Sequence, residues 1–492
     1  MLIPFVQTRV TPTLQSRGWN SRPDLHIELA GQTERCPNSY TTGDIIEGAV
    51  SISVECETNF DELKIIFEGS SETQQSQVIA LPSQARACHT FLELHRPIGD
   101  AEYPTPRTFV PGQIYRFPFI FVVPARLPPI MCDHTNCNIH VGRAHTLLPP
   151  SLGDPMLASD GCSLLDDMSS ELCRISYRIR ASLTKRSLSG KNARETLRAV
   201  AKKVRIIPAV EEEPPLVVTH DEDDYCMQNV KDIKTGITRT KRGSLMVTAS
   251  QPSPLQLYPP GFQSPSNVCT TATVNLRFDP IGNELPPKLG SLCSKLSVST
   301  FYTITPWNDF PSPSYVDSLG RHCYTTTVPL SSLCVSSTKW TKHSPVGMSR
   351  QSALVDMTPT KPSPSTSSKE DGTYYTAVMT VPVTIPPTKA FVPTFHSCLI
   401  SRTYALDMSI SYHTPNVNLL APSISLRLPI QITSLPRSQP LTHPPFYSEL
   451  RETEVRALQP SVSQPPTLLR DEFGLDALLP CCLESGLLNL HP

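Results

Sequence analysis

The segment from Phe109 to Pro124 constrains the fold of this chain more than any other part of its sequence. A Pro111-Gly112 turn leads into a run in which every second residue is aromatic, namely Tyr115, Phe117, Phe119 and Phe121. Such alternation is typical of a β-strand with one buried face. Because proline cannot donate a hydrogen bond to a neighbouring strand, Pro118 predicts that this strand lies at a sheet edge or at a bulge.

The same two-residue period recurs along the chain in two separate blocks. In the first block it is clearest from Ile175 to Leu183, where apolar residues alternate with arginine and serine. In the second block it is clearest from Tyr404 to Tyr412 and from Ile424 to Ile432. Short alternating strands between turn signals predict an all-β fold with two tandem β-sandwiches.

Composition shifts between these blocks predict the domain boundaries. A disordered leader is expected over residues 1–21, and a first sandwich over 22–209. Residues 210–242 carry acidic and then basic runs, and they predict a charged linker with at most one strand of its own. The second sandwich is expected over 243–436, interrupted by a Ser/Thr/Pro-rich insert at about 305–371 that predicts a long mobile loop. Residues 437–492 form a proline-rich tail.

The charge balance and the apolar segments exclude several classes of protein. The chain has 43 basic and 44 acidic residues, so no basic excess points to a nucleic-acid partner. The apolar stretch at the N-terminus is too short for a signal peptide, and no run approaches the roughly 20 residues that span a bilayer. These observations predict a cytoplasmic protein whose 15 cysteines are reduced thiols.

No set of residues in the sequence indicates catalysis. Neither a Gly-x-Ser-x-Gly elbow nor a phosphate-binding loop with Gly-Lys-Ser/Thr is present. The sequence therefore predicts no enzymatic activity and no cofactor.

The tail contains one segment with a specific binding chemistry, Pro444-Pro445-Phe446-Tyr447. It matches the Pro-Pro-x-Tyr ligand of WW domains. Adjacent prolines preset a polyproline II backbone, so little entropy is lost when the peptide docks into an aromatic groove. The sequence predicts that Pro444, Pro445 and Tyr447 contact a WW domain; the alternative is a proline-rich tail without a partner.

Four zinc-type ligands lie within one short stretch, at Cys132, His134, Cys137 and His140. Structural zinc sites usually divide their ligands between two distant pairs, so that the metal closes a loop. This crowded spacing favours an inter-strand loop, and the metal site remains the weaker interpretation.

A local basic cluster follows the strand at 175–183. Its positive charges could face an anionic membrane surface or an acidic segment of a partner, whereas the alternative is a solvated hairpin tip. Its members are Lys185, Arg186, Lys191, Arg194, Arg198, Lys202 and Lys203.

The order of these motifs resembles the arrestin family over residues 22–436, and in particular its alpha-arrestin branch, including members from filamentous fungi. The matching segments are Tyr40-Thr41-Thr42-Gly43-Asp44, Pro111-Gly112, Phe117-Pro118-Phe119, Leu147–Pro155, Ile175–Ala181, Phe395–Cys398 and Arg402–Leu406. The resemblance implies two arrestin-like, immunoglobulin-like sandwiches. The sequence gives no sign of the buried charged cluster that acts as a phosphate trigger in visual arrestins.

The resemblance also implies a function. Alpha-arrestins use such tail motifs to recruit HECT-type ubiquitin ligases to membrane transporter or receptor cargo. The expected partners are therefore a WW domain of a HECT-type ligase, cytosolic cargo segments, conjugated ubiquitin and an anionic membrane surface. Recruitment to the plasma membrane and endosomes would follow. The alternative is an arrestin-fold scaffold for endosomal sorting or signalling that acts without a ligase.

Overall fold

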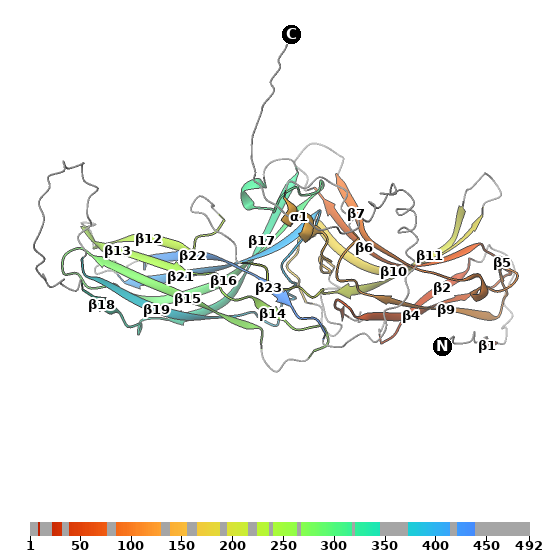
Figure 1. The fold of residues 1–492 in the computed structure, drawn as a ribbon, viewed down its shortest axis with the longest axis horizontal. Helices are drawn as coiled ribbons and strands as arrows, with labels where there is room; N and C mark the ends of the chain where they lie inside the picture. The colour runs from red at the N-terminus through yellow and green to blue at the C-terminus, as the bar shows by residue number, and fades with distance from the viewer. Residues whose placement is uncertain are drawn as a thin grey trace, which may run out of the picture. The chain divides into compact units, whose positions relative to one another are not determined.

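The computed structural model confirms an almost wholly β-stranded chain with two β-sandwiches (Figure 1). It describes residues 8–9, 22–31, 39–75, 85–128, 138–154, 165–186, 194–214, 224–235, 240–262, 267–316, 320–344, 372–413 and 421–437. One seven-residue α-helix, α1 (Ile139–His145), and the short 3-10 turns at Asp100–Glu102 and Pro313–Tyr315 are the helical elements within these ranges.

The first sandwich consists of two facing sheets. One sheet has the order β1-β9-β4-β2 and the other β3-β11-β10-β6-β7. A small pair, β5 with β8, lies beside them. The bounds are β1 (Thr8–Arg9), β2 (Asp24–Leu29), β3 (Ser39–Tyr40), β4 (Ile45–Ser53), β5 (Thr58–Asn59), β6 (Glu62–Gln74), β7 (Arg86–Arg96), β8 (Thr108–Phe109), β9 (Gln113–Val122), β10 (Cys173–Arg186) and β11 (Arg194–Ile206).

The second sandwich is built in the same way. Its sheets have the orders β12-β13-β15-β19-β18 and β17-β16-β21-β20, and β22 also pairs with β21. A parallel pair, β14 with β23, accompanies them. The bounds are β12 (Gln228–Thr235), β13 (Thr240–Ala249), β14 (Leu255–Leu257), β15 (Cys269–Pro280), β16 (Lys288–Thr303), β17 (Arg321–Cys334), β18 (Thr341–His343), β19 (Tyr374–Thr384), β20 (Phe395–His396), β21 (Ile400–His413), β22 (Ser423–Ile430) and β23 (Ile432–Ser434).

The aromatic strand is β9, and its predicted burial is confirmed. Tyr115, Phe117, Phe119 and Phe121 are each at most 2% exposed. Pro118 pairs with Ala49 of β4, while the two-residue β1 reaches only the start of β9. Among the described residues, only β4 pairs with β9 at Pro118, which agrees with a proline that has no N–H donor to offer a second strand. The preceding turn is also confirmed, because Gly112 has a φ of 79°.

A close approach between neighbouring strands of one sheet explains the glycine in β4. A Cβ atom at Gly48 would lie 2.3 Å from the carbonyl oxygen of Glu28 and 2.6 Å from the ring of Phe119. No side chain fits there without moving the aromatic core. The ring of Phe119 on β9 thus fills the space that a side chain at Gly48 of the adjacent strand would need.

Parts of the second sandwich differ from the predicted boundaries. The prediction of a loop at 305–371 is wrong over 321–334 and 341–343, where β17 and β18 form. Most side chains of β17 are exposed or half-buried on both faces, so its serines and threonines leave no apolar alternation to recognise. The charged linker is shorter than predicted, since β12 and the start of β13 occupy its second half. At the other end of the chain, β1 forms inside the expected leader.

Candidate functional site

The apolar core of the first sandwich includes residues from the second block of the chain. Val392, Phe395 and the segment from Cys398 to Ile400 pack in the same buried cluster as the inner faces of β9 and β10. Tyr302, at the end of β16, belongs to this cluster too. The joint between the blocks therefore has a continuous apolar core, which we call the joint core.

A buried cation lies at the same joint. Arg402 of β21 has no exposed surface, and its Nη1 donates to the backbone carbonyl of Asp167 at 2.8 Å. Its Nη2 donates to the carbonyl of Met168 at 3.3 Å. Its Nε has no hydrogen-bond partner among the described groups. Carbonyl dipoles from the first block thus solvate a charge that belongs to the second block.

The acidic segment around these carbonyls is anchored from both blocks. Asp166 forms an ion pair with Lys389 at 2.8 Å, and this hydrogen bond is the main reason why the pKa of Asp166 lies below its usual value. Asp167 accepts a hydrogen bond from the backbone N–H of Gly153 at 2.7 Å. Met168 adopts a left-handed φ of 57°, which is uncommon for a residue other than glycine. The segment is therefore held in one conformation with its carbonyls toward Arg402.

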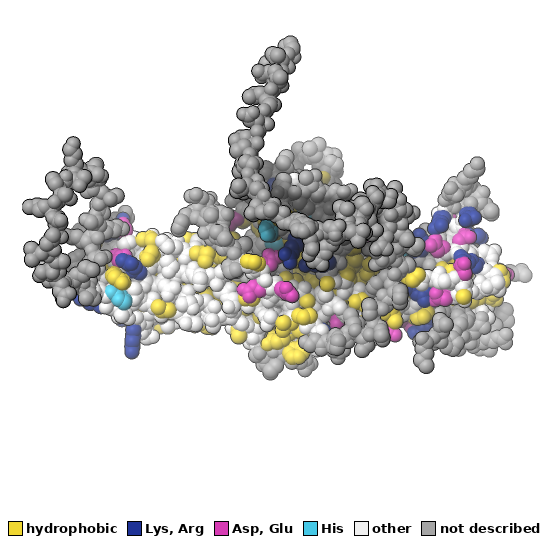
Figure 2. Space-filling view, in the orientation of Figure 1, with side chains coloured by type: hydrophobic (Ala, Val, Ile, Leu, Met, Phe, Trp, Pro, Cys, Tyr) yellow, Lys and Arg dark blue, Asp and Glu magenta, His cyan; other side chains and the backbone are white. Residues whose placement is uncertain are grey.

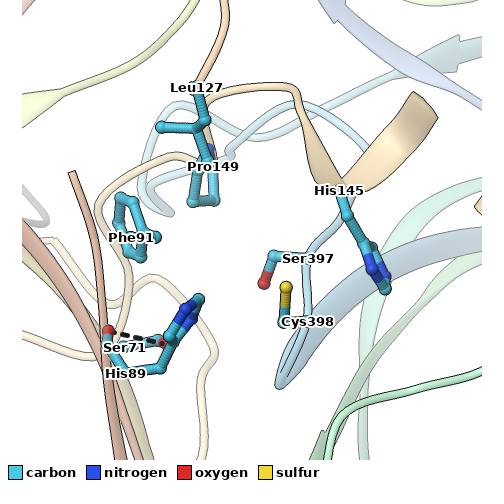
Figure 3. Close-up of a pocket in the computed structure, with 8 residues that line it drawn as sticks. All are labelled: Ser71, His89, Phe91, Leu127, His145, Pro149, Ser397 and Cys398. Atoms are coloured by element: carbon cyan, nitrogen blue, oxygen red, sulfur yellow. Dashed lines mark hydrogen bonds between the residues drawn. The ribbon is translucent and has the colours of Figure 1, made fainter. Parts of the chain in front are cut away.

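The joint also encloses a small cavity (Figure 3). Its volume is about 10 Å³, which accommodates about one water molecule. In Figure 3, Ser397 and Cys398 lie on one side of this space and Phe91, Leu127 and Pro149 on the other. Ser71, His89 and His145 complete the lining, and the Ser71 hydroxyl donates to the His89 carbonyl at 3.5 Å. A cavity of this size does not admit an organic substrate.

The predicted basic cluster lies on the hairpin of β10 and β11, and part of it is neutralised. Arg194 forms an ion pair with Glu62 at 2.6 Å, and Lys203 pairs with the buried carboxylate of Asp154. Figure 2 shows basic and acidic side chains intermingled around the end of this hairpin. Within the described ranges, the side chains of Lys185, Arg186, Arg198 and Lys202 form no ion pair, although the backbone N–H of Arg186 donates to Asp61. Lys191 lies outside the described residues.

Strand alternation divides this cluster between two faces. Lys202 stands opposite Ile179 and Arg198 opposite Leu183, so both are on the side of the sheet that faces the core. Lys203 stands opposite Arg178, and Arg194 opposite Arg186, on the outer side. Lys185 takes the core side by the same alternation. The six described residues of the cluster therefore do not form one continuous basic surface.

The other predicted site residues fall mostly outside the described part of the chain. Cys132, His134 and Cys137 do so, whereas His140 is exposed in the first turn of α1. Pro444, Pro445 and Tyr447 also lie outside it. Over the described ranges, no group of three or more His, Cys, Asp and Glu side chains is arranged to hold a metal ion. The zinc and WW-domain sites stay predictions.

Sequence reasoning missed Arg402 as a buried residue at the joint. The signal was available, because the alternation of Tyr404, Leu406, Met408, Ile410 and Tyr412 places Arg402 on the inward side when it is extended back by one step. An arginine at an inward position of a long apolar strand requires polar partners at that depth. Those partners are backbone carbonyls, which no residue pattern reveals.

The observed architecture defines the class as a tandem β-sandwich protein with a polar residue buried at its joint. No family model matches the chain, and no curated protein matches it. No helix in the described ranges has the length and apolar character needed to cross a membrane.

Proposed function

We propose that this chain is an arrestin-like adaptor that links a HECT-type ubiquitin ligase to membrane transporter or receptor cargo. The observation that carries the proposal is the Pro444-Pro445-Phe446-Tyr447 motif, which begins ten residues after β23 ends at Ser434. A ligand for a WW domain has to lie outside a packed core, and this motif follows the last strand that the structure describes. The tandem β-sandwich supports the proposal, since it supplies a large surface, and the cavity described at the joint holds only about one water molecule.

The mechanism follows from effective concentration. The two prolines dock into the aromatic groove of a WW domain, and Tyr447 fills the neighbouring pocket. When the sandwiches hold a cargo protein at the same time, the ligase stays close to the cytosolic lysines of that cargo. Ubiquitin is then transferred to these lysines, and the cargo enters the endocytic route. The chain itself contributes binding and no covalent chemistry.

Cargo or membrane contact is assigned to charged surfaces of the sandwiches. On the β10–β11 hairpin, Lys185, Arg186, Arg198 and Lys202 form no ion pair among the described residues, so an acidic cargo segment or an anionic headgroup can pair with their charges. The protein would act at the cytoplasmic side of the plasma membrane and endosomes. The lysines of this hairpin are also candidates for ubiquitin conjugation.

The test is a co-precipitation from cells that express the intact chain or its Pro445→Ala/Tyr447→Ala double variant. An adaptor recovers both a HECT-type ligase and membrane proteins, and the double variant loses the ligase while it keeps the membrane proteins. Equal recovery of the ligase by both forms contradicts the proposal. Recovery of membrane proteins without any ligase identifies the alternative, a ligase-independent sorting scaffold.

A further inference from the structure

The outer face of one sheet in the second sandwich contains a groove of about 980 Å³. The strands β17, β16, β21 and β22 turn their apolar side chains inward, as Leu296, Leu406 and Leu428 illustrate. The residues between them point to the opposite side of the sheet. Part of this side forms the groove, which we call the C-sheet groove.

Two registered rows of side chains cross the strands along this groove. The first row contains Pro329, Lys295, Asp407, Arg427 and Cys226, each opposite the next on a neighbouring strand. The second row contains Ser332, Cys293, Ser409 and Ser425, and the amide of Asn229 donates to the Ser425 carbonyl at 2.8 Å. All these residues line the groove. A charged row therefore lies beside a row of small polar side chains.

Asp407, the acidic residue of the charged row, already has hydrogen-bond and ion-pair partners. One oxygen of Asp407 accepts from the Ser297 hydroxyl at 2.6 Å, and Arg427 Nη1 lies 3.0 and 3.2 Å from its two oxygens. Arg427 also donates through Nε to the Asp224 carbonyl at 2.9 Å, which fixes the guanidinium in place.

Lys295 is the uncompensated charge of the groove. It is exposed and stands directly opposite Asp407, yet no ion pair joins these two residues. Among the described residues, no other carboxylate forms an ion pair with it. The lining thus holds two cations, Lys295 and Arg427, against the single carboxylate of Asp407. The net charge of the lining is one positive charge, next to a row of three serine hydroxyls and the Cys293 thiol in which the Ser425 hydroxyl donates to Ser409 Oγ at 3.5 Å.

We propose that the C-sheet groove binds an extended peptide segment that carries aspartate or glutamate side chains. The charged row would receive a carboxylate at Lys295 and the exposed edge of Arg427. The serine row would donate to the peptide backbone, and its small side chains would allow the backbone to approach the sheet. This inference rests on the proposed adaptor function, because it names the chemistry of the cargo segment.

The dimensions of the rows set the length of the ligand. Neighbouring strands lie about 4.8 Å apart, so a row that crosses four strands and ends at the Cys226 bridge spans roughly 19 Å. An extended chain rises about 3.3 Å per residue, and about six residues therefore cover one row. The groove is recessed between side chains. It therefore admits an extended peptide of about six residues, whereas a flat bilayer surface does not enter it.

The experiment is fluorescence anisotropy of the intact chain with a labelled peptide of alternating glutamate and alanine, about eight residues long. The matched probe replaces each glutamate by glutamine. We expect salt-dependent binding of the glutamate peptide and at least about tenfold weaker binding of the glutamine peptide. Lys295→Glu and Ser425→Glu should each weaken binding at least about fivefold, because both add a negative charge to the groove. Ser425 is exposed, so Ser425→Glu should leave the thermal midpoint unchanged, whereas Lys295→Glu places a carboxylate opposite Asp407 and should lower it slightly.

The control variant is Lys288→Glu, an equally charged change on the exposed part of the same strand, β16. It should leave the affinity unchanged within about twofold. Equal loss in Lys288→Glu and Lys295→Glu would overturn the proposal, since it would indicate a general charge effect. Binding of only a phosphoserine peptide, or only of phosphatidylserine vesicles, would overturn it as well.

The test of peptide binding in the groove can be distinguished from the test of ligase recruitment. The Pro445→Ala/Tyr447→Ala variant should bind the glutamate peptide like the unmodified chain, because the tail motif takes no part in the groove. Loss of ligase recovery with intact peptide binding would refute the adaptor and keep the groove. The reverse result would refute the groove and keep the adaptor.

Discussion

The Arg402 guanidinium and the Asp167 carbonyl oxygen lie 2.8 Å apart, although the two residues are 235 positions apart in the sequence. Arg402 belongs to the second block of the chain and Asp167 to the first. A second bond across the same joint runs from the Thr73 hydroxyl to the carbonyl of Thr303 at 2.7 Å. Together with the joint core, these bonds couple the stability of the two sandwiches.

We expect Arg402→Ala to lower the free energy of unfolding by about 3 kcal/mol or more. The variant removes charge-assisted hydrogen bonds, leaves the carbonyls of Asp167 and Met168 without their donor, and opens a cavity. Urea unfolding followed by tryptophan fluorescence measures the loss, since buried Trp307 donates its backbone N–H to the Cys398 carbonyl at the joint.

The control for this variant is Lys389→Ala, which breaks the more exposed ion pair with Asp166. A solvent-exposed pair contributes less than about 1 kcal/mol. If the two variants lose stability equally, Arg402 has no special role at the joint.

In β9, we expect Phe117→Ala to lower the free energy of unfolding by about 3–5 kcal/mol, because it empties a site whose side chain is 1% exposed. Ile120→Thr lies on the opposite face of the same strand, where Ile120 is 46% exposed, and should change it by less than about 0.5 kcal/mol. Chemical denaturation of both variants measures the two losses and so distinguishes the buried face of β9 from the exposed face. Similar losses would contradict the assignment of the buried side.

The stability of the chain should depend on pH through His396. Burial of its ring lowers the pKa of His396 from 6.5 to about 4, and its Nδ1 is enclosed although part of the residue remains exposed. The unfolded chain binds this proton more readily than the folded chain. Stability attributable to this residue is therefore fully present above pH 6.5 and is lost progressively as the pH falls toward 4.

Between pH 7 and pH 5 this loss amounts to about 2 kcal/mol. In His396→Gln, the fall in thermal midpoint over the same interval should be smaller than in the unmodified chain. Parallel pH profiles for the two proteins would show that His396 keeps its ordinary pKa when the chain is folded.

The strands with alternating apolar residues were predictable, and those without them were not. The faces of β9, β10 and β21 follow from a period of two, because each of these strands buries one side against a core. Strand β17 has no apolar period, since it pairs only with β16 within the described sheet and exposes both faces to some degree. Its serines and threonines are equally common in loops, so composition alone could not distinguish a strand from a loop over residues 321–334.

The candidate sites were predictable only in residue type. The basic residues of 185–203 form a visible cluster in the sequence, but their division between two faces depends on the register of β10 with β11 and on a bulge beside Leu183. The C-sheet groove could not be foreseen either. Its charged row brings together Lys295, Asp407 and Arg427 from three strands, and only the pairing of those strands makes them neighbours.

The most direct test of the adaptor is a calorimetric titration of the intact chain with a WW domain from a HECT-type ligase, with Tyr447→Ala alongside. The account predicts saturable one-to-one binding by the unmodified chain, no measurable binding by Tyr447→Ala, and the same thermal midpoint for both, since Tyr447 follows the last of the described strands. Phosphorylated Tyr447 should bind more weakly, because a dianion would enter an apolar pocket. Equal binding by the unmodified chain and Tyr447→Ala, or no binding by either, would contradict the claim that this motif recruits the ligase.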